Sequence, residues 1–164
     1  MSYFITPGKA ALIDALESWQ WIDFESRKPI LMTAFADVFF SGHDGIWFLD
    51  TLEGVLRFVC QSREELETIF STQEGQDTYL LSPLVDRAIR DEKRLGARHC
   101  YDFKLHPIVG GPIEYDNIEV QEFMVVLNLR GQLHDQVRDL PVGTKISKFV
   151  LLNDKTSKPW WKFW

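Results

Sequence analysis

Three short runs of apolar and aromatic residues stand close together between residues 37 and 58, and two polar turns separate them. The runs are residues 38–40, 46–49 and 55–59. Valine, isoleucine and aromatic side chains suit a pleated strand, and the glycines in both turns permit the positive φ that a tight hairpin needs. The pattern predicts a three-stranded antiparallel meander, and we expect the rest of the chain to be organised around it.

The middle run of the meander is apolar at every position from Ile46 to Leu49. Successive side chains of a strand point to opposite faces of a sheet, so Trp47 and Leu49 should alternate with Ile46 and Phe48. Because both sets are apolar, we expect other elements to cover both faces of this strand.

Helical spacing of apolar positions predicts a helix on each side of the meander. The first covers residues 7–22 and has a proline in its first turn, where proline is tolerated. The second covers residues 61–70, where Ser62 and Glu65 have the spacing of a capping box. Between the first helix and the meander, residues 29–40 are expected to form a loop or a short strand.

A further helix is predicted after a polar break with a glycine at residues 72–77. It begins near Asp77 or Ser82 and runs to about residue 95, where Gly96 ends it. Residues 100–109 then predict a strand.

Residues 116–138 fit a helix because their apolar positions recur with a step of four. A strand through residues 120–129 is the alternative, since the same residues are rich in β-branched and aromatic side chains. Apolar and polar residues alternate along residues 145–152, which predicts a last strand.

The fold class expected from these elements is α+β, a mainly antiparallel sheet around the meander, extended by strands near Tyr101 and Ile146 and packed against helices.

The chain has 164 residues, of which 45% are hydrophobic and 26% charged, as in an ordinary globular protein. We therefore expect a single domain over residues 1–164, with an aromatic tail at residues 155–164. The N-terminus lacks a secretory signal, and no apolar run approaches the ~18 residues of a membrane span, so a cytoplasmic protein without a membrane partner is expected. Cys60 and Cys100 are far apart in the chain and predict neither a disulfide nor a metal site.

The net charge is −6, from 24 acidic and 18 basic side chains. Phosphate binding depends on lysine and arginine, so the charge argues against a direct nucleic-acid partner and favours a basic protein. Four acidic residues form the densest candidate surface for such a partner: Glu114, Asp116, Glu119 and Glu122. If they begin a helix, Glu119 and Glu122 should lie on one side of it, while Asp116 serves as a cap.

Candidate chemistry is sparse, and we expect no catalytic residue, metal or cofactor. The histidines lack the spacing of metal-binding or nucleophilic motifs, and His43 with Asp44 is typical of a hairpin turn, although this pair is also a candidate for partner binding. A small hydrolase that uses Asp37, Asp50 and His134 is the least favoured alternative.

The aromatic tail contributes the other candidate binding residues, Trp160, Trp161 and Trp164. An exposed aromatic cluster of this size is rarely tolerated without a use. We expect the tail either to dock on the domain or to contact another chain, for example in a homodimer.

Three segments together resemble one bacterial family. They are residues 35–51, with Phe35-Ala36-Asp37 and Trp47-Phe48-Leu49-Asp50-Thr51; residues 110–118, with Gly110-Gly111 and Asp116-Asn117-Ile118; and residues 131–145, with Gly131-Gln132-Leu133-His134-Asp135-Gln136. The chain resembles the immunity-protein domain, often found after a GAD-like domain, that neutralises DNase effectors of type VI secretion. The resemblance implies that the protein binds a toxin and performs no catalysis. The alternative is a small regulatory or scaffolding module of the SMI/KNR type that binds a cellular protein.

Overall fold

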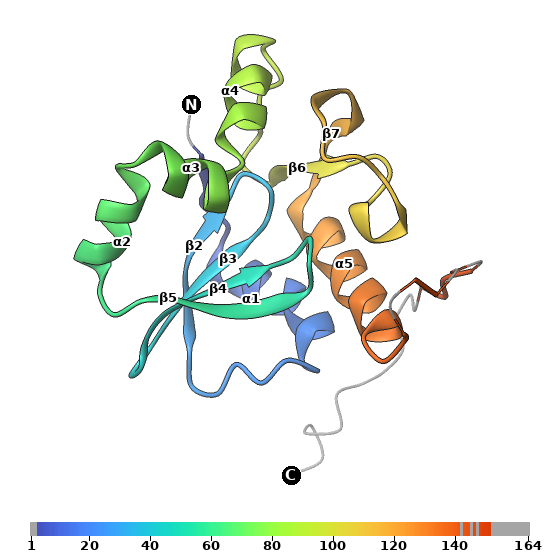
Figure 1. Ribbon diagram of the computed structural model, residues 1–164, viewed down its shortest axis with the longest axis horizontal. Coiled ribbons are helices and arrows are strands. Elements are labelled where there is room, and N and C mark those ends of the chain that lie inside the picture. Colours follow the sequence, from blue (N-terminus) through green and yellow to red (C-terminus); the bar gives the residue numbers. More distant parts are fainter. Residues whose placement is uncertain (1–2, 142, 145, 147, 152–164) are drawn as a thin grey trace.

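The computed structural model describes residues 3–141, 143, 144, 146 and 148–151. A five-stranded antiparallel sheet has the order β1-β2-β3-β4-β5, and a separate two-stranded ribbon pairs β6 with β7 (Figure 1). The strands of the sheet are Phe4–Ile5 (β1), Lys28–Thr33 (β2), Val38–Gly42 (β3), Gly45–Asp50 (β4) and Val55–Cys60 (β5), and those of the ribbon are His99–Phe103 (β6) and Ile118–Glu122 (β7). The helices are Lys9–Ala15 (α1), Arg63–Phe70 (α2), Gln73–Leu80 (α3), Ser82–Arg90 (α4) and Phe123–Val137 (α5), with 3-10 turns at Glu17–Trp19 (η1), Pro107–Val109 (η2) and Tyr115–Asn117 (η3). The predicted α+β fold class is confirmed.

The meander predicted around residues 37–58 is confirmed as β3, β4 and β5. β4 pairs with β3 on one side and with β5 on the other, so it is not an edge strand. Gly45 and Gly54 have the positive φ that was expected of turn glycines, at 116° and 70°. The β3–β4 register sets Val38 opposite Leu49 and Gly42 opposite Gly45.

The two faces of β4 belong to different cores, as its apolar pattern predicted. Ile46 and Phe48 pack with Leu66 of α2. Leu49, with Trp47 partly buried beside it, packs with residues of α1, η1 and α5. In Figure 1, α2 and α3 accordingly cover one side of the sheet, while α1 and α5 lie on the other.

A third core joins α4 to the ribbon. It includes Phe35 from the loop before β3, Val85 from α4, and Tyr101 and Ile118 from the two ribbon strands. The Tyr101 N–H donates to the Ala34 carbonyl over 2.7 Å, which ties the ribbon to the loop before β3. The ribbon is therefore held beside the main sheet without extending it, and the prediction that a strand near Tyr101 joins the sheet is wrong.

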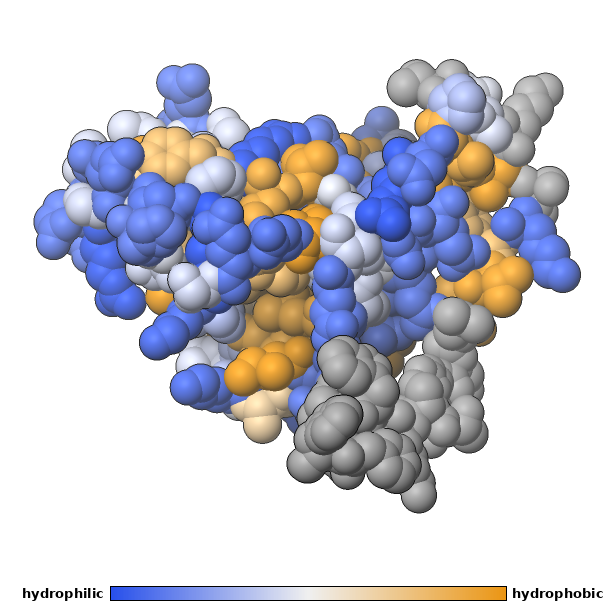
Figure 2. All heavy atoms as spheres, turned by 90° about the horizontal axis from the view of Figure 1, so that it is seen from below, coloured by the Kyte–Doolittle hydropathy of each residue, from blue (hydrophilic) through white to orange (hydrophobic). Residues whose placement is uncertain are grey.

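The first predicted helix is shorter than residues 7–22. α1 ends at Ala15 and the chain tightens into η1. The reason lies in α5, since the Trp19 Nε1–H donates to the Leu127 carbonyl at 2.9 Å and the Trp21 Nε1–H to the Gly131 carbonyl at 3.2 Å. These two bonds redirect the chain along α5 before another helical turn can form. This part of the chain runs along the lower side in Figure 1, and Figure 2 shows apolar side chains gathered on that side between hydrophilic borders.

The region after the meander contains one more helix than predicted. α2 and its cap are confirmed, because the Ser62 Oγ accepts from the Glu65 N–H at 3.2 Å. The polar break predicted at residues 72–77 is instead the start of α3, whose cap Thr72 accepts from the Gly75 N–H at 3.0 Å. The next helix, α4, begins at Ser82 as one alternative had it.

Two elements end earlier than predicted. α4 ends at Arg90 and not near residue 95, because Glu92 adopts a left-handed φ of 57° and the Lys93 N–H returns to the Ala88 carbonyl at 2.9 Å. The strand predicted at residues 100–109 ends at Phe103, because the chain turns into η2 at Pro107–Val109.

Residues 116–138 contain both of the predicted alternatives, divided at one boundary. The chain is extended in β7 up to Glu122 and helical from Phe123 in α5. Pairing of β7 with β6, a contact that local spacing does not encode, fixes the first part as strand.

The last predicted strand, at residues 145–152, is not present in its described residues, and Ile146 is not in a strand. Val150 pairs instead with the Gln136 side chain, which donates to its carbonyl at 2.8 Å and accepts from its N–H at 3.1 Å. In the described part of the chain, no helix is long and apolar enough to cross a membrane.

Candidate functional site

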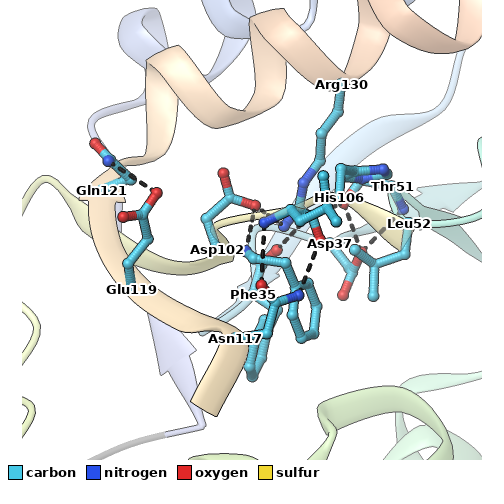
Figure 3. A network of polar contacts seen from close by, with 12 residues as sticks. Phe35, Asp37, Thr51, Leu52, Asp102, His106, Asn117, Glu119, Gln121 and Arg130 are labelled. Carbon is cyan, nitrogen blue, oxygen red and sulfur yellow. Dashed lines mark hydrogen bonds and ion pairs between the residues drawn. The ribbon is translucent and has the colours of Figure 1, made fainter. Parts of the chain in front are cut away.

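A buried arginine on α5 joins three parts of the fold. Arg130 is 2% exposed, and its Nη1 donates to the Phe35 carbonyl at 2.7 Å and to the Thr51 Oγ1 at 2.6 Å. Its Nη2 donates to the Asp102 Oδ1 at 2.7 Å in an ion pair. Figure 3 shows these side chains converging from the helix, the sheet and the ribbon. The charge of Arg130 is thus balanced by a carboxylate and by neutral acceptors inside the protein.

Asp37, which directly precedes β3, extends this network. The Thr51 N–H and Oγ1–H both donate to the Asp37 Oδ1, at 2.9 and 2.7 Å, while the Thr33 Oγ1 lies 3.3 Å from the Asp37 Oδ2. Burial raises the pKa of Asp37 to about 6, although the nearby Arg130 charge opposes the shift. The carboxyl group therefore holds a proton more tightly than an ordinary aspartate does.

Two histidines border the same network. The His134 Nε2 lies 3.1 Å from the Thr51 carbonyl and donates to it, and the ring centroids of His134 and His106 are 5.8 Å apart. The His106 Nδ1 accepts from the Ile108 N–H at 3.2 Å, so the proton of the neutral ring lies on Nε2. Burial, and then the positive charge of Arg130, lower the pKa of His106 to about 3, and burial also lowers the pKa of His134. Both rings are neutral at pH 7.

The ribbon ends in a surface loop of defined shape, residues 104–113. The Asn117 Nδ2 donates to the Leu105 carbonyl at 2.9 Å and to the Pro112 carbonyl at 2.8 Å, and its Oδ1 accepts from the Leu105 N–H at 3.0 Å. A Cβ at Gly111 would lie 1.7 Å from the Leu105 carbonyl oxygen, so only glycine fits there. One side chain and one glycine thus fix the two ends of the loop against each other.

The four acidic residues predicted as a partner surface do not begin a helix. Glu119 and Glu122 lie in β7, where a separation of three residues places them on opposite faces, so the prediction that they share a side is wrong. Glu122 pairs with Arg98 at 3.7 Å, and Glu119 accepts from the Gln121 amide. Glu114 and Asp116 are exposed around η3, and neither side chain caps that turn.

His43 and Asp44 form the turn between β3 and β4. Asp44 pairs with Arg27 at 2.6 Å, and this hydrogen bond lowers the pKa of Asp44. The Arg27 guanidinium also lies 4.0 Å from the Trp47 ring centroid. The register places this turn at the opposite end of the hairpin from Asp37 and Thr51, so it is separate from the network. The tail residues Trp160, Trp161 and Trp164 lie outside the described residues.

The residues of the hydrolase alternative come close together but are engaged internally. Asp37 and His134 both bond to Thr51, and the Asp50 Oδ1 accepts from the Leu52 and Glu53 N–H groups at 3.1 and 2.9 Å. A cavity of about 330 Å³ beside α1 and another of about 360 Å³ beside β1 are lined by other residues. Among the residues described, no group of three or more His, Cys, Asp or Glu side chains is placed to hold a metal ion.

The sequence reasoning missed Arg130, Thr51, Asp102 and Asn117. A signal existed for Arg130, because Val126, Leu127 and His134 lie three and four residues from it on the buried face of α5. A charged residue inside an apolar stripe indicates a buried partner. Asn117 had no comparable signal, since its three bonds depend on the folded loop.

Two of the three segments that carry the family resemblance contribute to this network, Phe35, Asp37 and Thr51 from the first and His134 from the third. Asn117 of the second segment bonds instead to the 104–113 loop, and Arg130 and Asp102 lie outside the three segments. No protein-family model matches the chain, and no curated protein sequence shows significant similarity to it.

Proposed function

We propose that this protein is a cytoplasmic immunity protein that binds and neutralises a cognate secreted toxin, a nuclease delivered by type VI secretion. The observation that carries the proposal is that two of the three resembling segments meet at Thr51. Thr51 of the first segment donates to Asp37 of the same segment, and its carbonyl accepts from His134 of the third. The second segment supplies Asn117, which holds the neighbouring 104–113 loop.

The polar groups support a role in binding over one in chemistry. Asp37 accepts from Thr51, and Asp50 accepts from backbone N–H groups. The Nη groups of Arg130 donate to Thr51, to Asp102 and to the Phe35 carbonyl. A nuclease must present a basic surface to phosphates, and an acidic protein gains association rate and affinity against such a surface. The net charge of −6 fits that partner.

The test uses the nuclease toxin gene that the proposed function places beside the gene for this protein. The purified toxin is titrated with this protein, and both the dissociation constant and DNA cleavage are measured. We expect nanomolar binding and loss of cleavage at one equivalent. The regulatory-module alternative predicts neither result, so an absence of binding at micromolar concentrations would overturn the proposal.

A further inference from the structure

The 104–113 loop presents apolar side chains to solvent. Leu105 is 49% exposed, Val109 38% and Ile113 52%. Three large apolar residues are thus exposed within nine positions of one loop, which is denser along the chain than the singly scattered apolar residues of an ordinary surface. Exposed apolar side chains on a loop of fixed shape are suited to contact a partner protein.

The shape of this loop is fixed at several points. Asn117 closes its ends with three hydrogen bonds, and the Gly111 N–H donates to the His106 carbonyl at 3.2 Å. The His106 ring lies edge-on to His134 of α5, which anchors the first part of the loop to the core. A loop held in this way loses little conformational entropy when a partner binds.

Exposed carboxylates border the apolar side chains. Glu114 follows Ile113 directly, and Asp116 lies two residues further along. The Lys104 ammonium group donates to the Asp116 backbone carbonyl at 2.9 Å, and no ion pair of Glu114 or Asp116 is seen among the described residues. The loop thus combines an apolar centre with an acidic edge.

We propose that the 104–113 loop, with Glu114 and Asp116 at its edge, is the surface through which this protein binds its toxin. The proposal rests on the proposed function and names the chemistry of the partner, an apolar depression bordered by lysine or arginine side chains. A stable interface buries about 800 Å² on each partner, so the loop forms its centre and neighbouring residues complete it. A few well-packed residues at the centre of an interface carry most of the binding energy.

The experiment compares three single variants in the same toxin titration. Leu105→Lys and Ile113→Lys each replace an apolar contact with a charge that a basic partner repels. Ile13→Lys is the matched control, because Ile13 is 49% exposed on α1. All three side chains are exposed, so thermal melting is expected to confirm that each variant folds like the wild type.

We expect Leu105→Lys and Ile113→Lys to weaken binding by about tenfold or more, and Ile13→Lys to change it less than about twofold. If the wild type binds the toxin and both loop variants bind equally well, the loop proposal is overturned while the proposed function stands. If the wild type does not bind, both are overturned. A Glu114→Gln, Asp116→Asn double variant should bind more weakly at low salt and show a shallower decrease of affinity as salt is raised.

Discussion

At Arg130, one guanidinium group joins the loop before β3, the turn after β4 and the ribbon. A buried charge lowers stability unless its partners are in place. A buried ion pair adds little net stability, but removal of one partner is strongly destabilising because the other charge is left unpaired. The residue therefore specifies how α5 sits on the sheet and the ribbon.

Replacing Arg130 with methionine should be strongly destabilising. The change leaves Asp102 as an unpaired, largely buried carboxylate and removes the donor to Thr51, so we expect a loss of about 3 to 5 kcal/mol in the free energy of unfolding. Urea denaturation measures it. Arg138→Met, at the exposed C-cap residue of the same helix, should change the free energy by less than about 1 kcal/mol. Equal stability of the two variants would contradict the role given to Arg130.

The same network predicts how stability depends on pH. His106 has a pKa lowered to about 3 in the folded protein, where the ring stays neutral. In the unfolded chain the same ring takes up a proton below about pH 6.5. Acidification from about pH 6.5 therefore favours unfolding. Asp37, with a pKa raised to about 6, acts in the opposite direction, because the folded protein binds its proton more tightly than the unfolded chain.

Urea denaturation between about pH 4.5 and pH 7 separates the two groups. His106→Asn keeps an acceptor for the Ile108 N–H but cannot be protonated, so stability should fall less on acidification than in the wild type. Asp37→Asn removes the opposing group, so stability should fall more steeply. The account would be wrong if both variants followed the wild-type pH dependence.

At the scale of elements, local patterns predicted those strands and helices whose neighbours lie close in sequence. The meander and α2 are of this kind, since hairpin turns and the Ser62 cap are local. β7 and the start of α5 follow each other without a turn signal, and pairing with β6 holds the first of them as a strand. α3 was missed because its glycine resembles a break, whereas Gly75 lies inside the helix against the Ile69 carbonyl.

The candidate site was predicted less well than the fold, for the same reason. Its acidic residues were predicted from their density in the sequence. The faces to which their side chains point depend on whether the segment is a strand or a helix. The bonds of Asn117 and Arg130 join residues separated by up to 95 positions, and no local spacing encodes such contacts.

Gly131 provides a prediction for the contact between α5 and η1. Alanine normally stabilises a helix interior relative to glycine by about 1 kcal/mol. Here a Cβ would lie 2.2 Å from the Ser18 Oγ and 2.8 Å from the Ser18 carbonyl oxygen, so Gly131→Ala should instead lower the free energy of unfolding by about 1 to 3 kcal/mol. Val125→Ala, at a side chain 47% exposed on the same helix, is the control and should change stability by less than about 0.5 kcal/mol. A stabilised Gly131→Ala protein would show that α5 does not pack closely on η1.

At the scale of the whole molecule, helices cover both faces of the meander, and the network at one end of the sheet supports the ribbon and its loop (Figure 1). The hairpin turn with His43 and Asp44 lies at the other end. This arrangement leaves the 104–113 loop as a fixed projection on an acidic molecule.

Survival of cells that express the nuclease toxin gene expected beside the gene for this protein tests the proposed toxin binding most directly. Viable counts are compared without the gene for this protein, with the wild-type gene and with the Ile113→Lys variant, while immunoblots verify equal protein levels. We expect the wild-type gene to restore survival and Ile113→Lys to restore it poorly. If cells with the wild-type gene die as readily as cells without it, this protein does not neutralise that toxin and the proposed function is wrong.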